Sequence, residues 1–178
     1  MSELYLSLGS NLGNRMANLR RALRLINERV GHVRRVSSFY ESQAVGFEST
    51  HRFLNCACRV ETNHTPQECL DLTQQIEQQL GRTQKSVDGV YHDRTIDIDL
   101  LTYDDLQLST PQLTLPHPHM HERNFVLVPL AELQKADDDA RKTPFGKKKL
   151  RPTPQRAHTH NYIYARAKVI SLPVATEK

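Results

Sequence analysis

The sequence predicts an α+β fold with a mainly antiparallel sheet. Two segments have the apolar spacing of amphipathic helices, and short apolar, β-branched segments around them indicate strands. The connections between strands are short, which favours antiparallel pairing. The chain has 178 residues, of which 38% are hydrophobic, and this is enough for one domain with its own core.

The first third of the chain alternates strands with one helix. Residues 4–8 indicate a short strand, and residues 9–14 a turn-rich connection. Apolar residues at helical spacing predict a helix over residues 15–30 that ends at Gly31. Residues 33–42 and 53–62 are predicted strands, joined by a loop over residues 43–52.

The second helix, predicted over residues 66–80, has the clearest start and stop signals. Thr65 can cap its first turn, Pro66 suits the first helical position, and Glu68 completes a capping box. Gly81 follows as the residue that ends the helix. Off the apolar stripe, the side chains at positions 74 and 77 lie three residues apart and can face a ligand together.

The rest of the chain contains two polar loops and one more helix. A polar loop over residues 81–93 leads to a predicted strand at 95–103 and is expected to be mobile over a site. Residues 104–109 indicate a turn and a short strand. A second polar loop opens at residue 115, and a short helix is predicted over residues 123–133.

Two aspartates in the 95–103 strand form the most informative pattern of the chain. Asp97 and Asp99 point to the same face, with Cα atoms roughly 6.5–7 Å apart, while Ile96, Ile98 and Leu100 point toward a core. Two such charges repel unless a cation lies between them. A pair of divalent ions about 3.5–4 Å apart would suit the gap and serves phosphoryl-type chemistry. The alternative is the exposed polar face of an edge strand.

Side chains must supply any phosphate contacts, because the sequence has neither a P-loop nor a GxGxxG fingerprint. Basic residues in or beside the two polar loops are the candidates, and arginine suits bidentate phosphate binding. For any single one of them, an ordinary surface charge is the alternative. The candidates are Arg82, Lys85, Arg94, His117 and Arg123.

Two other patterns have competing interpretations. His117, His119 and His121 alternate, but they lie in a proline-containing loop without a matching fourth ligand, which disfavours zinc. Phe53 and Phe125 are the aromatic residues best placed to sandwich a flat ring, and packing in the core explains their pattern equally well.

Several segments, taken together and in order over about residues 3–133, resemble one family. The most specific are Arg94-x-x-Asp97-x-Asp99-Leu100-Leu101 and Pro116-His117 followed by Arg123-x-Phe125. The others are Gly9-Ser10-Asn11-Leu12-Gly13, Ser37-Ser38-Phe39-Tyr40, Phe53-Leu54-Asn55 and Gln74-x-x-Glu77 with Gly81-Arg82. They resemble 6-hydroxymethyl-7,8-dihydropterin pyrophosphokinase, an enzyme of folate biosynthesis.

The resemblance implies a ferredoxin-like α+β sandwich, with helices packed on the sheet. It implies transfer of the β,γ-diphosphate of ATP to the hydroxymethyl group of the pterin, with AMP as the other product. Two Mg²⁺ ions would be held by Asp97 and Asp99, with Arg82 and Arg94 as the other catalytic residues. Mg²⁺ prefers carboxylates and phosphate oxygens, which agrees with the aspartate pair.

The resemblance also assigns two sets of binding residues. The ATP-binding set that it implies is Gln74, Glu77, Arg82, Arg94, Thr114, His117 and Arg123. The pterin-binding set that it implies is Ser42, Val45, Phe53, Asn55, Tyr91 and Phe125. Neither the residues nor the resemblance provides a convincing general base, although Asp97 or Asp99 could assist.

The end of the chain differs from the rest in charge. Residues 141–178 contain ten of the 24 Lys and Arg residues and a single acid, Glu177. The resemblance does not extend beyond about Ala136, so we predict a pyrophosphokinase domain over residues 1–136 and a basic extension over 137–178. A nucleic-acid-binding protein that uses this tail is the alternative from another class, although its few aromatic residues support base stacking weakly. A non-catalytic relative is a third alternative, disfavoured by the retained site residues.

Composition sets the expected location and partners. No apolar run approaches the roughly 18 residues of a transmembrane helix, and the N-terminus lacks the pattern of a signal peptide. The three cysteines do not have the spacing of a metal site, and we expect their side chains to be buried in the fold. Their odd number favours a reducing compartment. We expect a cytoplasmic monomer that binds ATP and the pterin, with no membrane partner and with nucleic acid disfavoured as a partner.

Overall fold

The computed structural model describes residues 1–82, 92–142 and 169–171, and six strands of this part form one sheet. The sheet order is β5 (Asp97–Tyr103), β1 (Ser2–Ser10), β4 (Phe53–Thr62), β3 (Phe39–Ser42) and β8 (Val169–Ser171), and β2 (His32–Val36) also pairs with β4. The β3–β8 pairing is parallel, whereas the others are antiparallel. The prediction of a mainly antiparallel sheet is confirmed.

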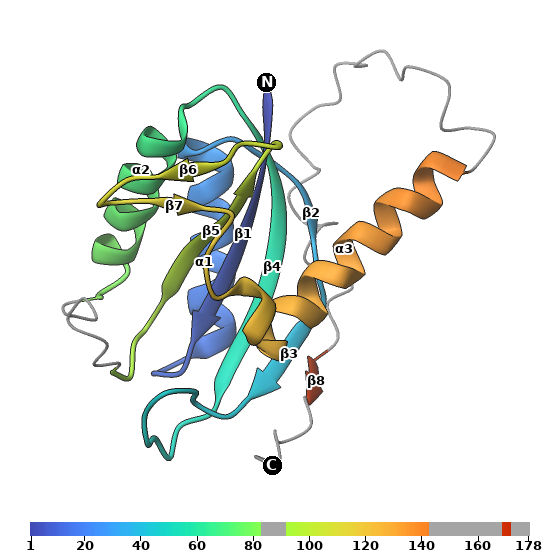
Figure 1. Cartoon of the computed structure of the whole chain (residues 1–178). Helices are drawn as coiled ribbons and strands as arrows, with labels where there is room; N and C mark the ends of the chain where they lie inside the picture. Colours follow the sequence, from blue (N-terminus) through green and yellow to red (C-terminus); the bar gives the residue numbers. More distant parts are fainter. Residues whose placement is uncertain (83–91, 143–168, 172–178) are drawn as a thin grey trace, which may run out of the picture.

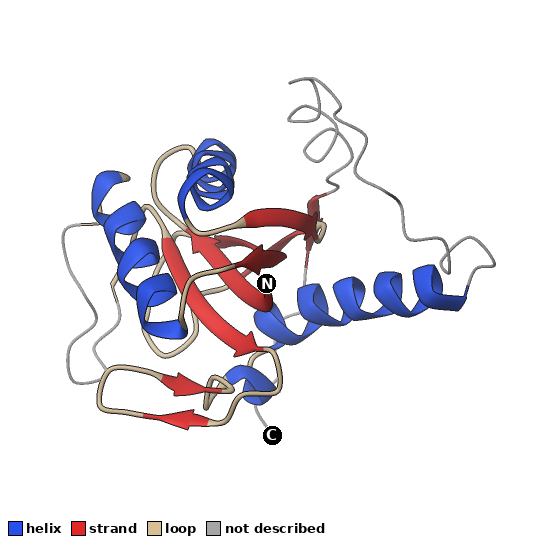
Figure 2. Cartoon of the chain, turned by 90° about the horizontal axis from the view of Figure 1, so that it is seen from above, coloured by secondary structure: helices blue, strands red, loops and turns tan. Residues whose placement is uncertain are grey.

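Helices cover both faces of this sheet (Figures 1 and 2). α1 (Arg15–Arg29) and α2 (Pro66–Gln79) pack on one face, and α3 (Asn124–Lys142) lies across the other, which we call the α3 face. The short 3₁₀ helix η1 (Met120–Glu122) precedes α3, and a small hairpin of β6 (Leu108–Ser109) and β7 (Thr114–Leu115) lies beside β5. The chain has the predicted ferredoxin-like α+β sandwich fold. No helix in the described ranges is long and apolar enough to span a bilayer.

Local signals explain where the helices begin. The side chain of Asn14 caps α1 by accepting a hydrogen bond from the backbone N–H of Ala17 at 3.0 Å. The predicted capping box of α2 is present, because Thr65 and Glu68 each accept from the other's backbone N–H. These caps satisfy backbone donors that a helix start otherwise leaves unpaired.

Each face of the sheet has its own apolar cluster. Leu4, Leu6 and Leu8 of β1 are fully buried beneath α1 and α2, together with Ile98 and Leu100 of β5. The residues between them on each strand point to the α3 face, where a smaller cluster contains Leu101, Met120, Val126 and Leu130. The alternation therefore places Asp97 and Asp99 together on the α3 face, and the prediction that they share one face is confirmed.

Two predicted elements differ from those observed. The single strand expected over residues 33–42 is divided into β2 and β3. At the break, the backbone N–H of Ser37 donates to the Ala57 carbonyl, and the Ser37 side-chain Oγ accepts from the Ala57 N–H, each at 2.9 Å. Glu132 accepts from the N–H and the hydroxyl of Ser38. The helix expected over 123–133 instead runs from Asn124 to Lys142. The expectation stopped at Leu133 because the buried apolar stripe ends there, whereas the polar residues that follow are also helical.

Candidate active site

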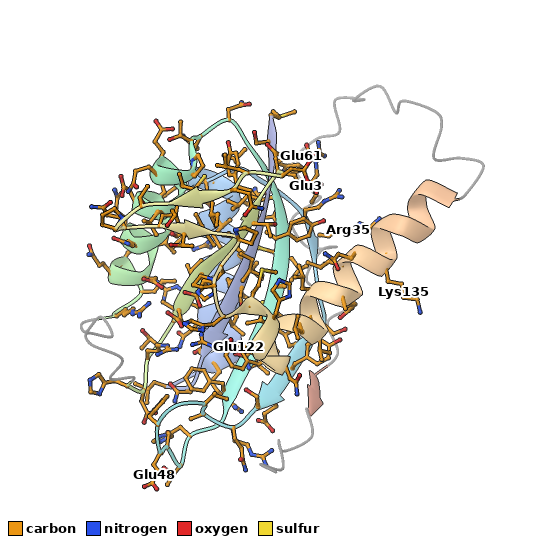
Figure 3. The ribbon with its side chains drawn as sticks, in the orientation of Figure 1. Glu3, Arg35, Glu48, Glu61, Glu122 and Lys135 are labelled. Atoms are coloured by element: carbon orange, nitrogen blue, oxygen red, sulfur yellow. The ribbon has the colours of Figure 1, made fainter. Side chains whose placement is uncertain are left out.

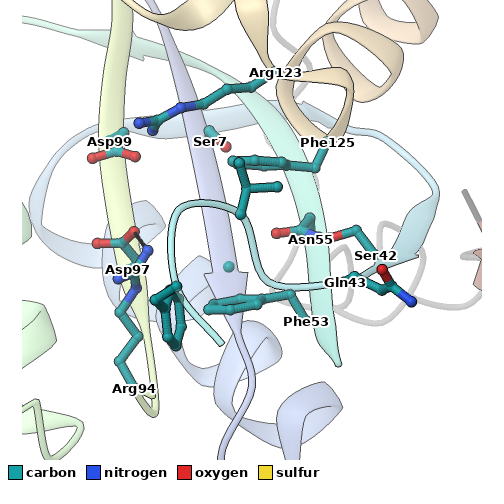
Figure 4. Close-up of a pocket in the computed structure, with 13 residues that line it drawn as sticks. Ser7, Ser42, Gln43, Phe53, Asn55, Arg94, Asp97, Asp99, Arg123 and Phe125 are labelled. Atoms are coloured by element: carbon teal, nitrogen blue, oxygen red, sulfur yellow. Dashed lines mark hydrogen bonds and ion pairs between the residues drawn. The ribbon is translucent and has the colours of Figure 1, made fainter. Parts of the chain in front are cut away.

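A pocket opens on the α3 face where β1, β4 and β5 lie side by side (Figure 4). The loop over residues 43–52 and the start of α3 form its other walls. The space between these walls, including the part open to solvent, is about 460 Å³. Figure 4 shows carboxylates on one side of the pocket and aromatic rings on the other. The lining residues are Ser7, Gly9, Ser42, Gln43, Val45, Phe47, Phe53, Asn55, Arg94, Asp97, Asp99, Arg123 and Phe125.

The carboxylate side is formed by Asp97 and Asp99 of β5. In the β1–β5 ladder they lie opposite Gly9 and Ser7, so small residues leave room in front of both carboxylates. Burial raises the pKa of Asp99 to about 7, and the nearby charge of Asp97 adds to this effect. The site therefore favours a cation at Asp99, because a positive charge there would offset the cost of ionisation.

Two arginines hold Asp97 in the structure. Arg82 Nη1 donates to Asp97 Oδ1 at 2.6 Å, and Arg94 Nη2 lies 2.7 Å from Asp97 Oδ2. Arg82 also pairs with Glu77, whose Oε1 accepts from the backbone N–H of Ile98 at 2.7 Å. Glu77 is 5% exposed, and burial raises its pKa to about 7. Glu77 thus ties the end of α2 to the aspartate strand.

The opposite side of the pocket is aromatic. The rings of Phe47 and Phe53 meet edge to face, with centroids 6.2 Å apart. The guanidinium of Arg94 lies 5.3 Å from the centre of the Phe53 ring, and that of Arg123 lies 5.8 Å from the centre of the Phe125 ring. Because Arg94 also pairs with Asp97 and the charge of Arg123 acts on Asp99, these two arginines lie between the aromatic side and the carboxylate side of the pocket.

A fixed amide lies among these rings (Figure 4). Asn55 of β4 is 3% exposed, and its Nδ2 donates to the Ser42 hydroxyl at 2.9 Å. A Cβ atom built on Gly9 would lie 3.0 Å from Asn55 Oδ1 and 3.5 Å from the Phe53 ring. Glycine at position 9 therefore keeps the space that the amide oxygen and the ring need.

The structure brings most of the predicted site residues to this one pocket. Nine of them line it: Ser42, Val45, Phe53, Asn55, Arg94, Asp97, Asp99, Arg123 and Phe125. Arg82 and Glu77 lie behind the carboxylates rather than in the lining. Tyr91 and Lys85 lie outside the described residues.

Three predicted ATP contacts lie away from the lining. Gln74 is half-buried on α2, and Thr114 is exposed on β7. The backbone N–H of His117 donates to the Leu101 carbonyl at 2.8 Å, which holds this loop against β5. Burial and the charge of Arg123 lower the pKa of the His117 imidazole, so the ring favours its neutral form.

Sequence reasoning missed four lining residues: Ser7, Gly9, Gln43 and Phe47. For Ser7 and Gly9 a signal was available, because they alternate with the buried leucines of β1 and therefore occupy the opposite face. No periodic pattern identifies Gln43 or Phe47, since both belong to an irregular loop.

The aspartate pair is chemically suited to Mg²⁺. Within the described residues no group of three or more His, Cys, Asp or Glu side chains could hold a metal ion. Two carboxylates alone nevertheless match the way in which Mg²⁺ is bound, through one or two carboxylates completed by water and substrate phosphates. The raised pKa of Asp99 and the small residues opposite both aspartates fit such an ion.

Comparison with known proteins identifies the family. Residues 5–135 match the model of the 7,8-dihydro-6-hydroxymethylpterin-pyrophosphokinase (HPPK) family. The 2-amino-4-hydroxy-6-hydroxymethyldihydropteridine pyrophosphokinase of Porphyromonas gingivalis is 49% identical over 134 residues, which cover 75% of this chain and 91% of that protein. The Bacillus subtilis enzyme of the same name is 39% identical over 163 residues, or 90% of this chain and 96% of that protein.

Solved structures agree on the fold. A crystal structure of a Plasmodium falciparum HPPK-DHPS triple mutant superposes with a TM-score of 0.59 at 16% identity, over 74% of this chain. The chain spans only 39% of that longer protein. On the family match and the identity to these relatives, the chain belongs to the 7,8-dihydro-6-hydroxymethylpterin-pyrophosphokinase family.

Proposed function

We propose that this pocket performs the reaction of its family. The chain transfers diphosphate from ATP to the hydroxymethyl group of 6-hydroxymethyl-7,8-dihydropterin, giving AMP and the pterin diphosphate in folate synthesis. One observation carries the assignment to this pocket. A carboxylate pair flanked by arginines faces an aromatic, amide-lined half, so one cavity can hold a polyphosphate and a flat heterocycle side by side.

The carboxylate half is proposed to receive the triphosphate. Asp97 and Asp99 would hold two Mg²⁺ ions, which when bound neutralise phosphate charge and help to ionise the attacking hydroxyl. Arg82 and Arg94 now pair with Asp97. Phosphate oxygens suit the planar arrangement of donors in a guanidinium group, so both arginines are assigned to the triphosphate.

The remaining predicted nucleotide contacts are proposed from the family resemblance. The charges of Arg123 and Asp97 both act on the His117 ring, which indicates that His117 and Arg123 lie near the carboxylate half. Gln74, Glu77 and Thr114 are proposed as more distant contacts. Of these, Glu77 is the one tied directly to the site, through Arg82 and the Ile98 backbone.

The aromatic half is proposed to receive the pterin. Phe53 and Phe125 would stack on the pterin ring, and the Asn55 amide, held by Ser42, would read the ring's polar edge. Val45 is 57% exposed in the loop that borders this half, so it is free to contact a bound ring. Tyr91 is proposed as a further aromatic contact.

Positioning and electrostatics supply the rate in this arrangement. The pterin hydroxymethyl oxygen bonds to the β-phosphorus of ATP while the bond from that phosphorus to the oxygen of the α-phosphate breaks, and AMP leaves with that oxygen. The arginines stabilise the charge that gathers on the transferred group. The aromatic walls hold the nucleophile in line with the bond that breaks.

Three further properties are proposals. We propose that the chain acts as a monomer in the cytoplasm. We also propose that residues 1–136 form the catalytic domain and residues 137–178 a basic extension, which includes the end of α3 and the strand β8 that pairs with β3. Sedimentation of the purified chain tests whether it is a monomer, and the activity of a chain that ends at residue 136 tests the domain division.

The deciding experiment measures AMP release from ATP, Mg²⁺ and 6-hydroxymethyl-7,8-dihydropterin, with and without EDTA. AMP that needs both the pterin and the metal is the expected result. Folded protein that releases no AMP, or releases it equally without pterin, would overturn the assignment.

A further inference from the structure

The loop over residues 43–52 forms a wall of the pocket but buries little of itself. Gln43, Val45 and Phe47 line the cavity, yet Gln43 and Val45 are exposed. Figure 3 shows Glu48 at the outer end of this loop, at the opposite end of the molecule from Glu3 and Glu61. With so few buried side chains, the position of the loop depends on its polar contacts.

Asp93 provides the main polar contacts of this loop with the segment before β5. The Ser49 hydroxyl donates to Asp93 Oδ1 at 2.6 Å, and His51 Nδ1 lies 3.1 Å from Asp93 Oδ2. Ser49 Oγ also accepts from the His51 backbone N–H at 3.0 Å, so the two loop residues approach the carboxylate as one unit. Hydrogen bonds from Ser49 and Asn11 lower the pKa of Asp93 and keep it ionised.

The same carboxylate reaches a third segment. Asn11, 2% exposed in the connection between β1 and α1, donates from Nδ2 to Asp93 Oδ1 at 2.6 Å. Asn11 and Arg94 are joined by two further bonds: Arg94 N–H to Asn11 Oδ1 at 2.7 Å, and Asn11 N–H to the Arg94 carbonyl at 3.1 Å. Asp93 therefore links the loop to the backbone of an arginine that pairs with Asp97.

We propose that Asp93 is a positioning residue for the pterin, which holds the 43–52 loop against the pocket through Ser49 and anchors it to the Asn11–Arg94 pair. The inference rests on the proposed function, since it takes the loop to be a wall of the pterin half. Asp93 itself does not line the pocket and is not proposed to contact either substrate.

This role differs in its consequences from general structural support. Loss of Asp93 removes these contacts of the loop but leaves the two hydrogen bonds between Asn11 and the Arg94 backbone in place. The pterin should therefore bind more weakly while ATP binding changes little. A variant that merely destabilised the fold would lower the fraction of active enzyme and leave both KM values unchanged.

The test compares Asp93→Ala, Ser49→Ala and the double variant in the full chain, with Asp105→Asn as an exposed control. In Asp93→Ala the pterin KM is expected to rise about tenfold, as for the loss of charged hydrogen bonds, with ATP KM within about twofold of wild type. Because Ser49 acts through the same carboxylate, the double variant should be no worse than Asp93→Ala alone.

Calorimetric titration with 6-hydroxymethylpterin provides a second measure that does not need turnover. If the wild type is active and Asp93→Ala has the same pterin KM and pterin Kd as wild type, the inference is overturned while the proposed function stands. The inference would also be overturned if the rise in pterin KM of the double variant were the product of the rises in the two single variants. A wild type that neither binds the pterin nor releases AMP would overturn the proposed function and this inference together.

Discussion

Arg82 and Asp97 form an ion pair of 2.6 Å between the end of α2 and the start of β5. The side chains of both are largely buried, at 12% and 16% exposure, and Arg82 is also held by Glu77. The pair neutralises one carboxylate of the aspartate pair. Burial instead raises the pKa of Asp99, and the charges of Arg94 and Arg123 offset this rise only in part. The two carboxylates therefore contribute differently to the same site.

Replacement of either aspartate by its amide should abolish most of the activity. Asp97→Asn and Asp99→Asn keep the shape of the side chains but lose the charge that binds a cation, so AMP formation should fall at least about 10²–10³-fold. Steady-state AMP release measures the loss, and thermal unfolding checks that each variant is folded. Asp105→Asn, in the exposed turn after β5, serves as the control. Full activity in either active-site variant would disprove the metal assignment.

A single methyl group at position 9 should weaken pterin binding. In Gly9→Ala the new Cβ would lie 3.0 Å from Asn55 Oδ1, and that amide is already fixed by Ser42. Displacing the amide should raise the pterin KM about tenfold, the usual scale of an overpacked contact, with little change in ATP KM. Initial rates at varied pterin and fixed ATP test this. Equal effects on both KM values would show that position 9 acts elsewhere.

Loss of the Phe125 ring should also act on the pterin. Phe125 is only half-buried, so Phe125→Leu keeps apolar volume and removes the stacking surface at moderate cost to the fold. A loss of about 1 kcal/mol, or roughly fivefold in pterin Kd, is expected. Titration calorimetry measures it. Val128→Ala, at a 37% exposed position of the same helix, should leave pterin Kd unchanged.

Local sequence signals predicted much of the fold. The capping box at Thr65 and the stop at Gly81 fixed the limits of α2 because they act between neighbouring residues. The break between β2 and β3 could not be predicted in this way. It depends on Ser37 and Ser38 bonding to residues 20 and 94 positions away.

The same distinction applies to the site. Asp97 and Asp99 could be placed on one face from strand alternation alone, and the resemblance supplied the aromatic residues. Which residues lie opposite them depends on strand register, which brings Ser7 and Gly9 beside β5 from the start of the chain. The contacts of Asp93 depend on the path of an irregular loop, for which the sequence offers no period.

The base of that loop gives a prediction for stability as a function of pH. Glu41 Oε1 accepts from Arg15 Nη1 at 2.9 Å, and Arg52 Nη1 lies 3.4 Å from its other oxygen. The hydrogen bond from Arg15 lowers the pKa of Glu41 below its ordinary value of 4.5. A carboxyl whose pKa is lowered by folding stabilises the folded state above its unfolded pKa. That contribution is lost as pH falls through the folded pKa.

Glu41→Gln should therefore lower the free energy of unfolding by about 1 kcal/mol at pH 7, a value limited by the partial exposure of the pair. Below pH 4.5 the difference from wild type should shrink, because the wild-type carboxylate itself becomes protonated. Urea unfolding of both proteins at pH 7, 5, 4 and 3 tests this. Glu28→Gln provides the matched control, since Glu28 forms an exposed 3.8 Å pair with Arg24, and little change is expected at any pH. A difference for Glu41→Gln that stays constant from pH 7 to pH 3 would show that the charge of Glu41 does not stabilise the fold.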